Sequence, residues 1–294
     1  MFFSGAHYIV NRINPCLSIF IISSALLSIA QGEPVNEKDL NQWHIDAAAG
    51  DITAQHDLGL AYHLGEGTPQ DNAKAIKWFL KAANQGHHQS QNTLGRLYQM
   101  GRGITKDITE AFKWYSEAAD GGYSKSQYNL ALLYFSGEGM PVDYKMAAIW
   151  FEKSALQGHA KAQLKLANMH AKGIGVKKDI VTASKWLEMA ATQGEIVAQA
   201  LLANMYHSGD GLKQDSTKAA KWYRKAAENG EVNSQYILGF YYATGNGVSQ
   251  SNLLAYKWWN LAAKQGYEDA IHNLGILAER MSEEDIEQAK DMSR

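Results

Sequence analysis

The sequence contains ten histidines, and histidine is a common metal ligand and general acid–base group. His63 and His207 occupy the same position of a repeating unit described below, but they are four units apart, too far to chelate one ion. His87 and His88 are adjacent, so on a helix they point in different directions. We therefore expect scattered surface histidines, with no metal site, no cofactor and no catalytic residue.

Six Gly-x-Gly pairs could suggest phosphate-binding loops. No strand precedes them and no Gly-Lys-Ser/Thr follows, and six copies require a structural explanation. The segments SGEG (136–139) and SGDG (208–211) have no nucleophile-elbow context. A regularly spaced aspartate column could imitate calcium ligands, but its spacing does not form an EF-hand loop. These residues are therefore interpreted as parts of turns and helix caps.

The formal net charge is −2. Binding to phosphate backbones needs a basic excess, so we expect no nucleic acid and no anionic membrane as the main partner. The single cysteine, Cys16, lies near the N-terminus. The remaining chain can form no disulfide and no thiolate metal site, so its stability must come from packing.

The N-terminal segment has features of an export signal. Leu17 to Ala30 is a run of 14 residues without a charge, preceded by Arg12 and ending Ser28-Ile29-Ala30. A membrane-spanning helix needs about 20 apolar residues, and small residues at these positions suit cleavage before Gln31. We expect a signal peptide over residues 1–30 and a periplasmic or secreted protein. An uncleaved anchor is the alternative.

The rest of the chain repeats with a period of 36 residues. Glycine recurs at this interval from Gly50 to Gly266, and six of the eight tryptophans share one column from Trp78 to Trp258. Alanine always stands three residues before that tryptophan and five residues after it. A fixed period of this length indicates a repeat architecture.

Each column has a physical explanation as part of a helical hairpin. Ala54, Leu58 and Tyr62 follow helical spacing and form one face of a first helix. Gly65 suits the end of that helix, where positive φ is common, and Asp71 suits the N-cap of a second helix. The glutamine column beginning at Gln55 is expected to bond backbone between hairpins.

A hairpin of this kind cannot bury both faces alone, so successive units must stack. The predicted fold is all-α, a right-handed α-solenoid of 36-residue helix-turn-helix repeats. We expect an N-terminal capping half-repeat over 31–50, six repeats over 51–266, and a half-repeat with a C-terminal capping helix over 267–294. The acidic start and basic end of SEEDIEQAKDMSR (282–294) match the helix dipole, so this helix should cover the last apolar face.

These columns closely resemble the Sel-1-like repeat family, relatives of tetratricopeptide repeats with a Gly-x-Gly loop between the helices. The shared pattern is AQHDLGLAYHLGEGTPQDNAKAIKWFLKAANQG, and the resemblance covers about residues 40 to 292. It implies a non-enzymatic scaffold or adaptor that binds a protein or peptide on its concave surface. Exported bacterial members often engage host or envelope proteins, so host interaction, virulence and envelope regulation are open possibilities.

Some cysteine-rich relatives are linked to penicillin binding or β-lactam hydrolysis. This chain has none of their cysteine pairs, which argues against carrying that activity over. An enzyme or binding protein of the β-lactam or peptidoglycan class is therefore kept only as the alternative function. Nitrocefin turnover that a point mutation abolishes would favour it. We expect the mature chain to be a monomer without an integral membrane segment.

In tetratricopeptide-like arrays the first helices line the concave surface. By analogy, four positions of each first helix, equivalent to Thr53, His56, Leu60 and His63, should face the groove. The candidate partner-binding residues in these positions or beside them are Asn92, Arg96, Lys125, Tyr128, Leu132, Phe135, Lys161, Leu164, Asn168, Asn204, Tyr236 and Phe240.

The middle of this surface combines apolar and basic side chains. Tyr128, Leu132, Phe135 and Leu164 should form an apolar patch with Arg96, Lys125 and Lys161 around it, while the asparagines could bond a peptide backbone. The expected partner is an extended or helical segment with apolar anchors and some acidic side chains. Alternatively, tight winding could bury these residues. If the patch is a free surface, alanine at Tyr128 and Phe135 should weaken binding and leave the melting temperature nearly unchanged.

Overall fold

The computed structural model describes residues 37–293, and every regular element in that range is an α-helix. The predicted signal segment, residues 1–30, lies outside the described residues. Six helical hairpins alternate first and second helices. The first helices are α3 (Ile52–Leu64), α5 (His88–Met100), α7 (Ser124–Ser136), α9 (Ala160–Lys172), α11 (Ile196–Ser208) and α13 (Val232–Thr244). The second helices are α4 (Asn72–Asn84), α6 (Ile108–Asp120), α8 (Tyr144–Leu156), α10 (Ile180–Thr192), α12 (Ser216–Glu228) and α14 (Asn252–Lys264).

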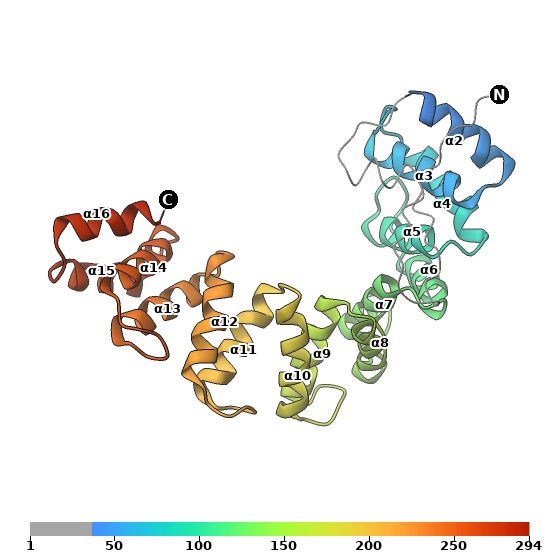
Figure 1. The fold of residues 1–294 in the computed structure, drawn as a ribbon. Coiled ribbons are helices and arrows are strands. Elements are labelled where there is room, and N and C mark those ends of the chain that lie inside the picture. Colours follow the sequence, from blue (N-terminus) through green and yellow to red (C-terminus); the bar gives the residue numbers. More distant parts are fainter. Residues whose placement is uncertain (1–36, 294) are drawn as a thin grey trace, which may run out of the picture. The chain divides into compact units, whose positions relative to one another are not determined.

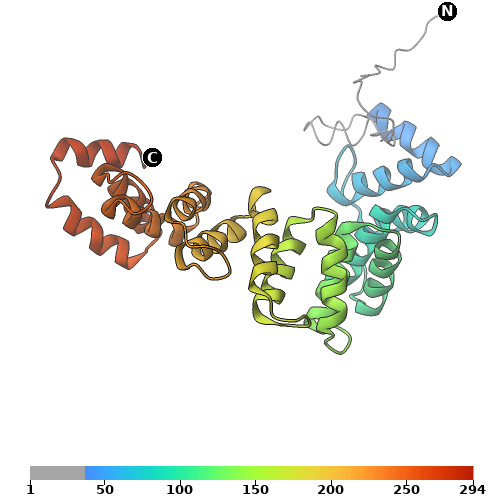
Figure 2. The same cartoon turned by 60° about the horizontal axis from the view of Figure 1, so that its bottom comes forward.

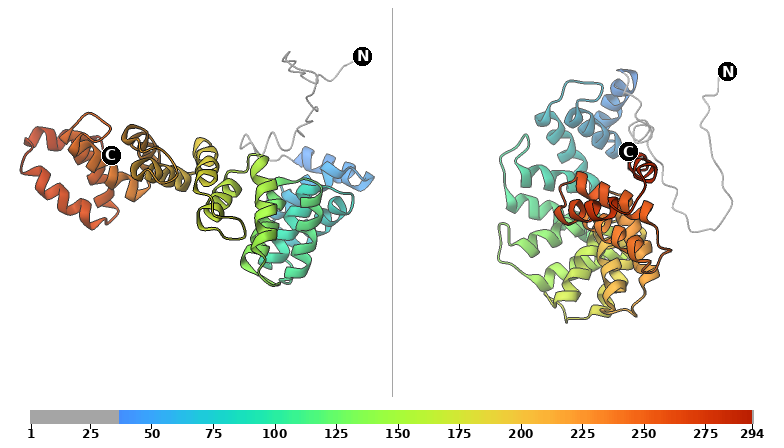
Figure 3. Two further views of the ribbon diagram at one scale, coloured as in Figure 1. Left: turned by 90° about the horizontal axis from the view of Figure 1, so that it is seen from below. Right: turned by 90° about the vertical axis from the view of Figure 1, so that its left-hand side faces the viewer.

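The chain forms two compact units, residues 1–85 and 86–294. The first unit contains α2 (Glu37–Ala49), α3 and α4, and the second contains α5 to α16. Within the second unit the helices follow one another in chain order, and each second helix packs against the first helix before it and the one after it (Figure 1). The other views show the same succession of hairpins (Figures 2 and 3). The predicted all-α solenoid of helix-turn-helix repeats is confirmed.

The glycine and aspartate columns have the predicted roles at the helix ends. Gly65 ends α3 with φ 76°, and the Gly-x-Gly glycine of each later repeat also has positive φ. The Asp71 side chain accepts a hydrogen bond from the Lys74 N–H, satisfying one of the unpaired donors of the first turn of α4. The other second helices begin with the same kind of cap, at Asp107, Asp143, Asp179, Asp215 and Ser251.

Glycine in the middle of three first helices allows an aromatic ring to lie directly against the helix backbone. A Cβ atom built on Gly95 would lie 2.6 Å from the Tyr115 ring, and one built on Gly239 would lie 2.4 Å from the Trp259 ring. No real Cβ atom approaches another atom so closely, so the packed position of the second helix depends on the missing side chain. The glycine at this position of the first helix is therefore a packing requirement.

The glutamine column connects neighbouring hairpins. Gln127 Nε2 donates to the carbonyl oxygen of Ala119 in the preceding hairpin at 3.1 Å, and its Oε1 accepts from Gln157 Nε2 at 2.7 Å. The same pair of bonds recurs around Gln55, Gln163 and Gln235. The side chains are buried, so each satisfied amide stabilises the stacking of repeats. The predicted structural role of this column is confirmed.

The fifth repeat lacks one bond of this ladder. Asn229 stands where Gln157, Gln193 and Gln265 donate, and within residues 37–293 the buried Oε1 of Gln199 has no hydrogen-bond partner. We expect Asn229→Gln to raise the free energy of unfolding by about 1 kcal/mol, the usual net value of one hydrogen bond. Urea denaturation measures the change. In a Gln199→Leu background the gain should disappear, and an equal gain there would contradict this explanation.

Both ends of the array are covered by additional helices. Trp43 and Ala47 of α2 are buried within the first unit, where α2 packs against α3. At the other end, α15 (Glu268–Ala278) is followed by α16 (Glu283–Asp291), which packs on α14 and buries Ala289. The Ser282 side chain caps α16 by accepting a hydrogen bond from the Asp285 N–H. None of the helices in residues 37–293 has the length and apolarity needed to cross a membrane.

Candidate functional site

The candidate site is the surface formed by the first helices of the second unit, here called the first-helix face. Consecutive first helices contact one another directly through side chains. Ser126 of α7 donates to Asn92 of α5 at 3.0 Å, and the ring nitrogen of His207 on α11 lies 2.6 Å from the Tyr241 hydroxyl on α13. Residues from successive repeats therefore lie side by side on this face.

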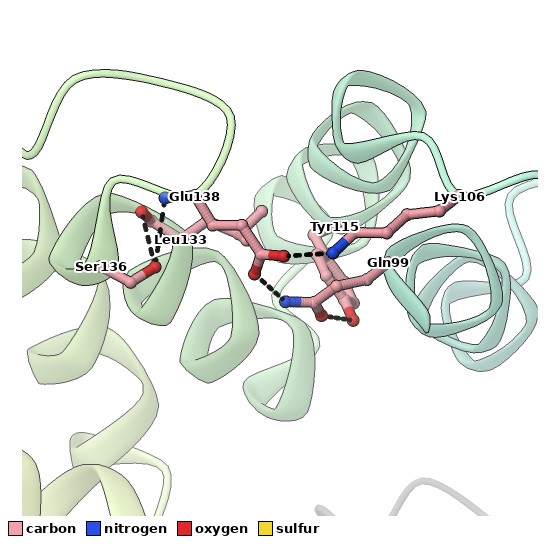
Figure 4. Close-up of polar contacts among 6 residues, drawn as sticks. All are labelled: Gln99, Lys106, Tyr115, Leu133, Ser136 and Glu138. Carbon is pink, nitrogen blue, oxygen red and sulfur yellow. Dashed lines mark hydrogen bonds and ion pairs between the residues drawn. The ribbon is translucent and has the colours of Figure 1, made fainter. Parts of the chain in front are cut away.

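One polar network joins α5, α6 and the loop that follows α7 (Figure 4). Glu138 accepts from Gln99 Nε2 on one carboxylate oxygen and from Lys106 Nζ on the other, both at 3.0 Å. Gln99 in turn accepts from the Tyr115 hydroxyl at 2.9 Å. The hydrogen bonds from Gln99 and Lys106 hold the pKa of Glu138 below its ordinary value. The network fixes the loop after α7 against α5 and α6.

Glu138 makes part of the stability pH-dependent. Because its pKa is lower in the folded state, its contribution is complete above its unfolded pKa, about 4.3, and is lost as pH falls through the folded value. The Lys106 side chain is 56% exposed, so solvent screens the pair and the contribution should not exceed about 1 kcal/mol. Glu138→Gln should lower the free energy of unfolding at pH 7 and make almost no difference at pH 3. A larger deficit at pH 3 than at pH 7 would contradict this.

Tyr128 and Phe135 of the predicted apolar patch meet on one buried ring. Phe151 is fully buried, and its ring centroid lies 5.7 Å from that of Tyr128 and 6.3 Å from that of Phe135. Tyr128 also stacks on His159 with centroids 4.7 Å apart, and Phe135 contacts the Tyr144 ring edge to face. Both candidate side chains are half-buried. Their replacement by alanine should therefore lower the melting temperature, which changes the expectation made from sequence.

The basic side chains expected around the patch remain exposed. Lys125 on α7 and Lys161 on α9 are both solvent-accessible, and both lie close enough to His159 to influence its charge. Burial lowers the pKa of His159, and the two lysines lower it further. Arg96 is also exposed, on α5. The structure therefore gathers Lys125, Lys161 and Tyr128 around His159.

The two predicted leucines belong to different packing clusters. Leu132 packs with Tyr128 and Phe135 against the core around Phe151. Leu164 instead packs against the core of the following repeats, with Leu202 and Tyr223 among its buried residues. The structure thus places the patch residues on neighbouring helices but does not join all four into one cluster.

The three predicted asparagines differ in their surroundings. Asn92 is buried, and its side-chain oxygen accepts from both Ser126 and Asn129 at 3.0 Å, so this group supports the contact between α5 and α7. Asn168 and Asn204 instead line a cavity of about 210 Å³ between α9, α10 and α11. Asn204 is exposed, and its side-chain oxygen accepts from the Tyr223 hydroxyl at 2.6 Å.

A larger cavity, of about 510 Å³, lies between α11 and α13. Asn204 and Tyr236 line it, and Tyr236 stacks on Tyr267 with centroids 4.7 Å apart. Glu231, Ser234 and Tyr267 also line it, and these were not among the residues singled out from the sequence. Phe240 is 49% exposed on the same helix, α13. The first-helix face therefore contains an aromatic cluster near α7 and a hollow near α13.

Glu231 and Tyr267, together with His159, share a signal that the sequence does contain. His159, Glu231 and Tyr267 all occupy the N-cap of a first helix, a column whose residue type changes from repeat to repeat. That position precedes the helix, so it is not among the four helical positions from which the candidate residues were predicted. Within residues 37–293, no group of three or more histidine, cysteine, aspartate or glutamate side chains is placed to hold a metal ion.

Comparison with known proteins identifies the repeats. The Sel1 repeat family model matches residues 52–87, 88–123, 124–159, 160–195, 196–231 and 232–267. A Sel1 repeat protein from Oxalobacter formigenes has a similar structure, with a TM-score of 0.68 and 29% identity over 81% of this chain and 95% of that chain. A protective antigen of uropathogenic Escherichia coli with an SLR fold is similar at a TM-score of 0.51 and 25% identity over 90% and 80% of the two chains. No curated protein matches the sequence.

Proposed function

Because the chain belongs to the Sel1 repeat family, whose repeats generally mediate contacts between proteins, we propose that it is a non-enzymatic adaptor. The proposed partner is a protein or peptide segment that binds on the concave surface expected from the sequence, which corresponds to the first-helix face of the second unit. The adaptor is exported and monomeric, and it acts in the envelope or on a host protein.

One observation supports this proposal: the first-helix face contains exposed side chains that lie outside the repeated packing columns. The repeated alanine, glutamine and aromatic columns are mostly buried or capped, and they account for stacking. In contrast, Lys125, Asn204 and Phe240 are exposed and occupy positions whose residue type changes along the array. A surface whose residues are free of the packing pattern, and which includes aromatic anchors and hollows, is suited to selective binding.

The chemistry of the face favours a segment with apolar anchors. Half-buried aromatic side chains such as Tyr128 and Phe135 can bury further area at little entropic cost, because the core already holds their rings. The lysines near α7 and α9 favour acidic side chains in the part of the partner that binds there.

A pull-down with paired variants tests this function. The protein is immobilised, bound proteins are identified by mass spectrometry, and the yield is compared for Asn168→Ala/Phe240→Ala and for the second-helix pair Ile149→Ala/Val181→Ala. Ile149 and Val181 are exposed apolar residues on α8 and α10, so they control for general stickiness. We expect the first-helix pair alone to lose a specific partner. Loss with the second-helix pair alone would contradict the proposal.

A further inference from the structure

The wall of the cavity between α11 and α13 includes one small residue at a position that is larger in the preceding repeats. Ala200 lines it, and the equivalent positions of the three preceding repeats hold Asn92, Tyr128 and Leu164. Each of those larger side chains is half-buried or buried. At about 510 Å³ the cavity lies within the usual range of ligand pockets, roughly 300–1,000 Å³.

Alanine at position 200 offers no acceptor to the buried hydroxyl of Ser234, which has no hydrogen-bond partner among the described residues. In the third repeat Ser126 donates to Asn92 at 3.0 Å, and Ser234 is the equivalent serine two helices after Ala200. Ser234 is 1% exposed, lines the cavity, and its Oγ has no hydrogen-bond partner in the described chain. An unsatisfied buried hydroxyl is unfavourable, so a polar ligand group in the cavity would remove this cost.

The charge at the cavity is negative. Glu231 lines it, and its carboxylate accepts from the backbone N–H of Ser234 at 2.6 Å and from the backbone N–H and side-chain Nδ2 of Asn233, each at 3.3 Å. No lysine or arginine lines the cavity, and among the described residues Glu231 takes part in no ion pair. A carboxylate has more acceptor sites than these bonds use, so it can accept a charged donor in a fixed orientation.

Aromatic faces complete the lining. The stacked rings of Tyr236 and Tyr267 both border the cavity, as does the buried Tyr223. A planar guanidinium stacks on such rings and donates to a carboxylate in a forked geometry, whereas an ammonium is a compact, strongly hydrated point charge. A carboxylate ligand would be repelled by Glu231.

We propose that the cavity lined by Ala200, Glu231, Ser234 and the Tyr236–Tyr267 stack binds the guanidinium of an arginine side chain. This inference deepens the proposed function, since it names one anchor of the partner segment and distinguishes its chemistry from that of the lysine-bordered end near α7.

Titration with blocked amino acids tests the site without any knowledge of the partner. The probes are N-acetyl-L-arginine amide, its neutral isostere the citrulline amide, and the lysine amide, each followed by saturation-transfer NMR on the full chain. We expect the arginine amide to bind with a dissociation constant on the order of 1 mM, as for a small ligand with few contacts. The citrulline and lysine amides should bind at least about tenfold more weakly.

Two variants and one control locate the binding. Ala200→Leu places the residue of position 164 into the cavity and should abolish binding, and Glu231→Gln should weaken it about tenfold. Glu188→Gln makes the same charge change at an exposed site on α10 and should have no effect. Circular dichroism melting confirms folding, and Ala200→Asn, which copies the Asn92–Ser126 pair, replaces Ala200→Leu if that variant fails to fold.

Several results would overturn the inference. They are no binding by the wild type, binding that survives in both Ala200→Leu and Glu231→Gln, or equal binding of the citrulline or lysine amide. If partner capture still depends on Phe240 in such a case, the proposed function stands and this site alone is wrong. If arginine binds here but the yield of captured partner is unchanged by substitutions on the first-helix face, the site stands and the proposed function is wrong.

Discussion

Leucine in place of Gly239 is expected to destabilise the protein strongly, whereas leucine in place of Gly275 is not. Both glycines occupy the same column of a first helix. A Cβ atom at Gly239 would lie 2.4 Å from the Trp259 ring, and a Cβ atom at Gly275 would meet nothing within 4 Å. Overpacking of this kind costs about 1–3 kcal/mol or more, because the whole ring must move.

The pair separates packing from helix propensity. Leucine is a better helix former than glycine by up to about 1 kcal/mol, so Gly275→Leu should be neutral or slightly stabilising. Urea denaturation followed by circular dichroism measures both variants. Equal destabilisation at the two positions would show that the glycine column does not act by allowing the aromatic ring to approach the backbone.

Alanine in place of Phe151 is expected to have the largest effect of any single truncation near the candidate site. The side chain is fully buried and supports the rings of both Tyr128 and Phe135. Removing a buried phenylalanine costs about 3–5 kcal/mol through lost burial and the cavity left behind. Partner binding should fall as well, because two candidate anchors lose their support.

Phe240→Ala is the matched control for this change. Phe240 is 49% exposed, so the same truncation should change the free energy of unfolding by no more than about 0.5 kcal/mol. It should nevertheless weaken partner binding. Unfolding curves and pull-down yields for the two variants therefore distinguish a residue that holds the candidate anchors in place from one that contacts the partner directly. A destabilisation by Phe240→Ala as large as that by Phe151→Ala would contradict the description of this surface.

The local rules of the fold could be predicted from sequence because they repeat. Asp71 as an N-cap, Gly65 at positive φ and Gln55 as a link between hairpins each follow from residue type at a fixed position, and six copies remove the ambiguity of one. The terminal helix α16 was predicted from its charge pattern. These features depend on local geometry, which sequence spacing specifies well.

The candidate site was harder to predict, because it depends on differences between neighbouring repeats. Asn92 was expected to face a peptide, but Ser126 of the next repeat occupies its oxygen. The cavity beside Ala200 lies where the preceding repeats have a larger residue, and the Oγ of Ser234 lacks a hydrogen-bond partner among the described residues. Helical position alone does not reveal which space a neighbouring repeat fills.

Site-specific photocrosslinking is the most direct test of whether a partner binds on the first-helix face. A benzoyl-phenylalanine residue is placed at Phe240 on the first-helix face or at Ile149 on a second helix, both exposed apolar positions, and the cross-linked protein is identified by mass spectrometry. We expect one discrete cross-linked partner from position 240 and none from position 149. Adding an excess of the free partner should suppress the cross-link from position 240. A specific cross-link from position 149 with none from position 240 would contradict it.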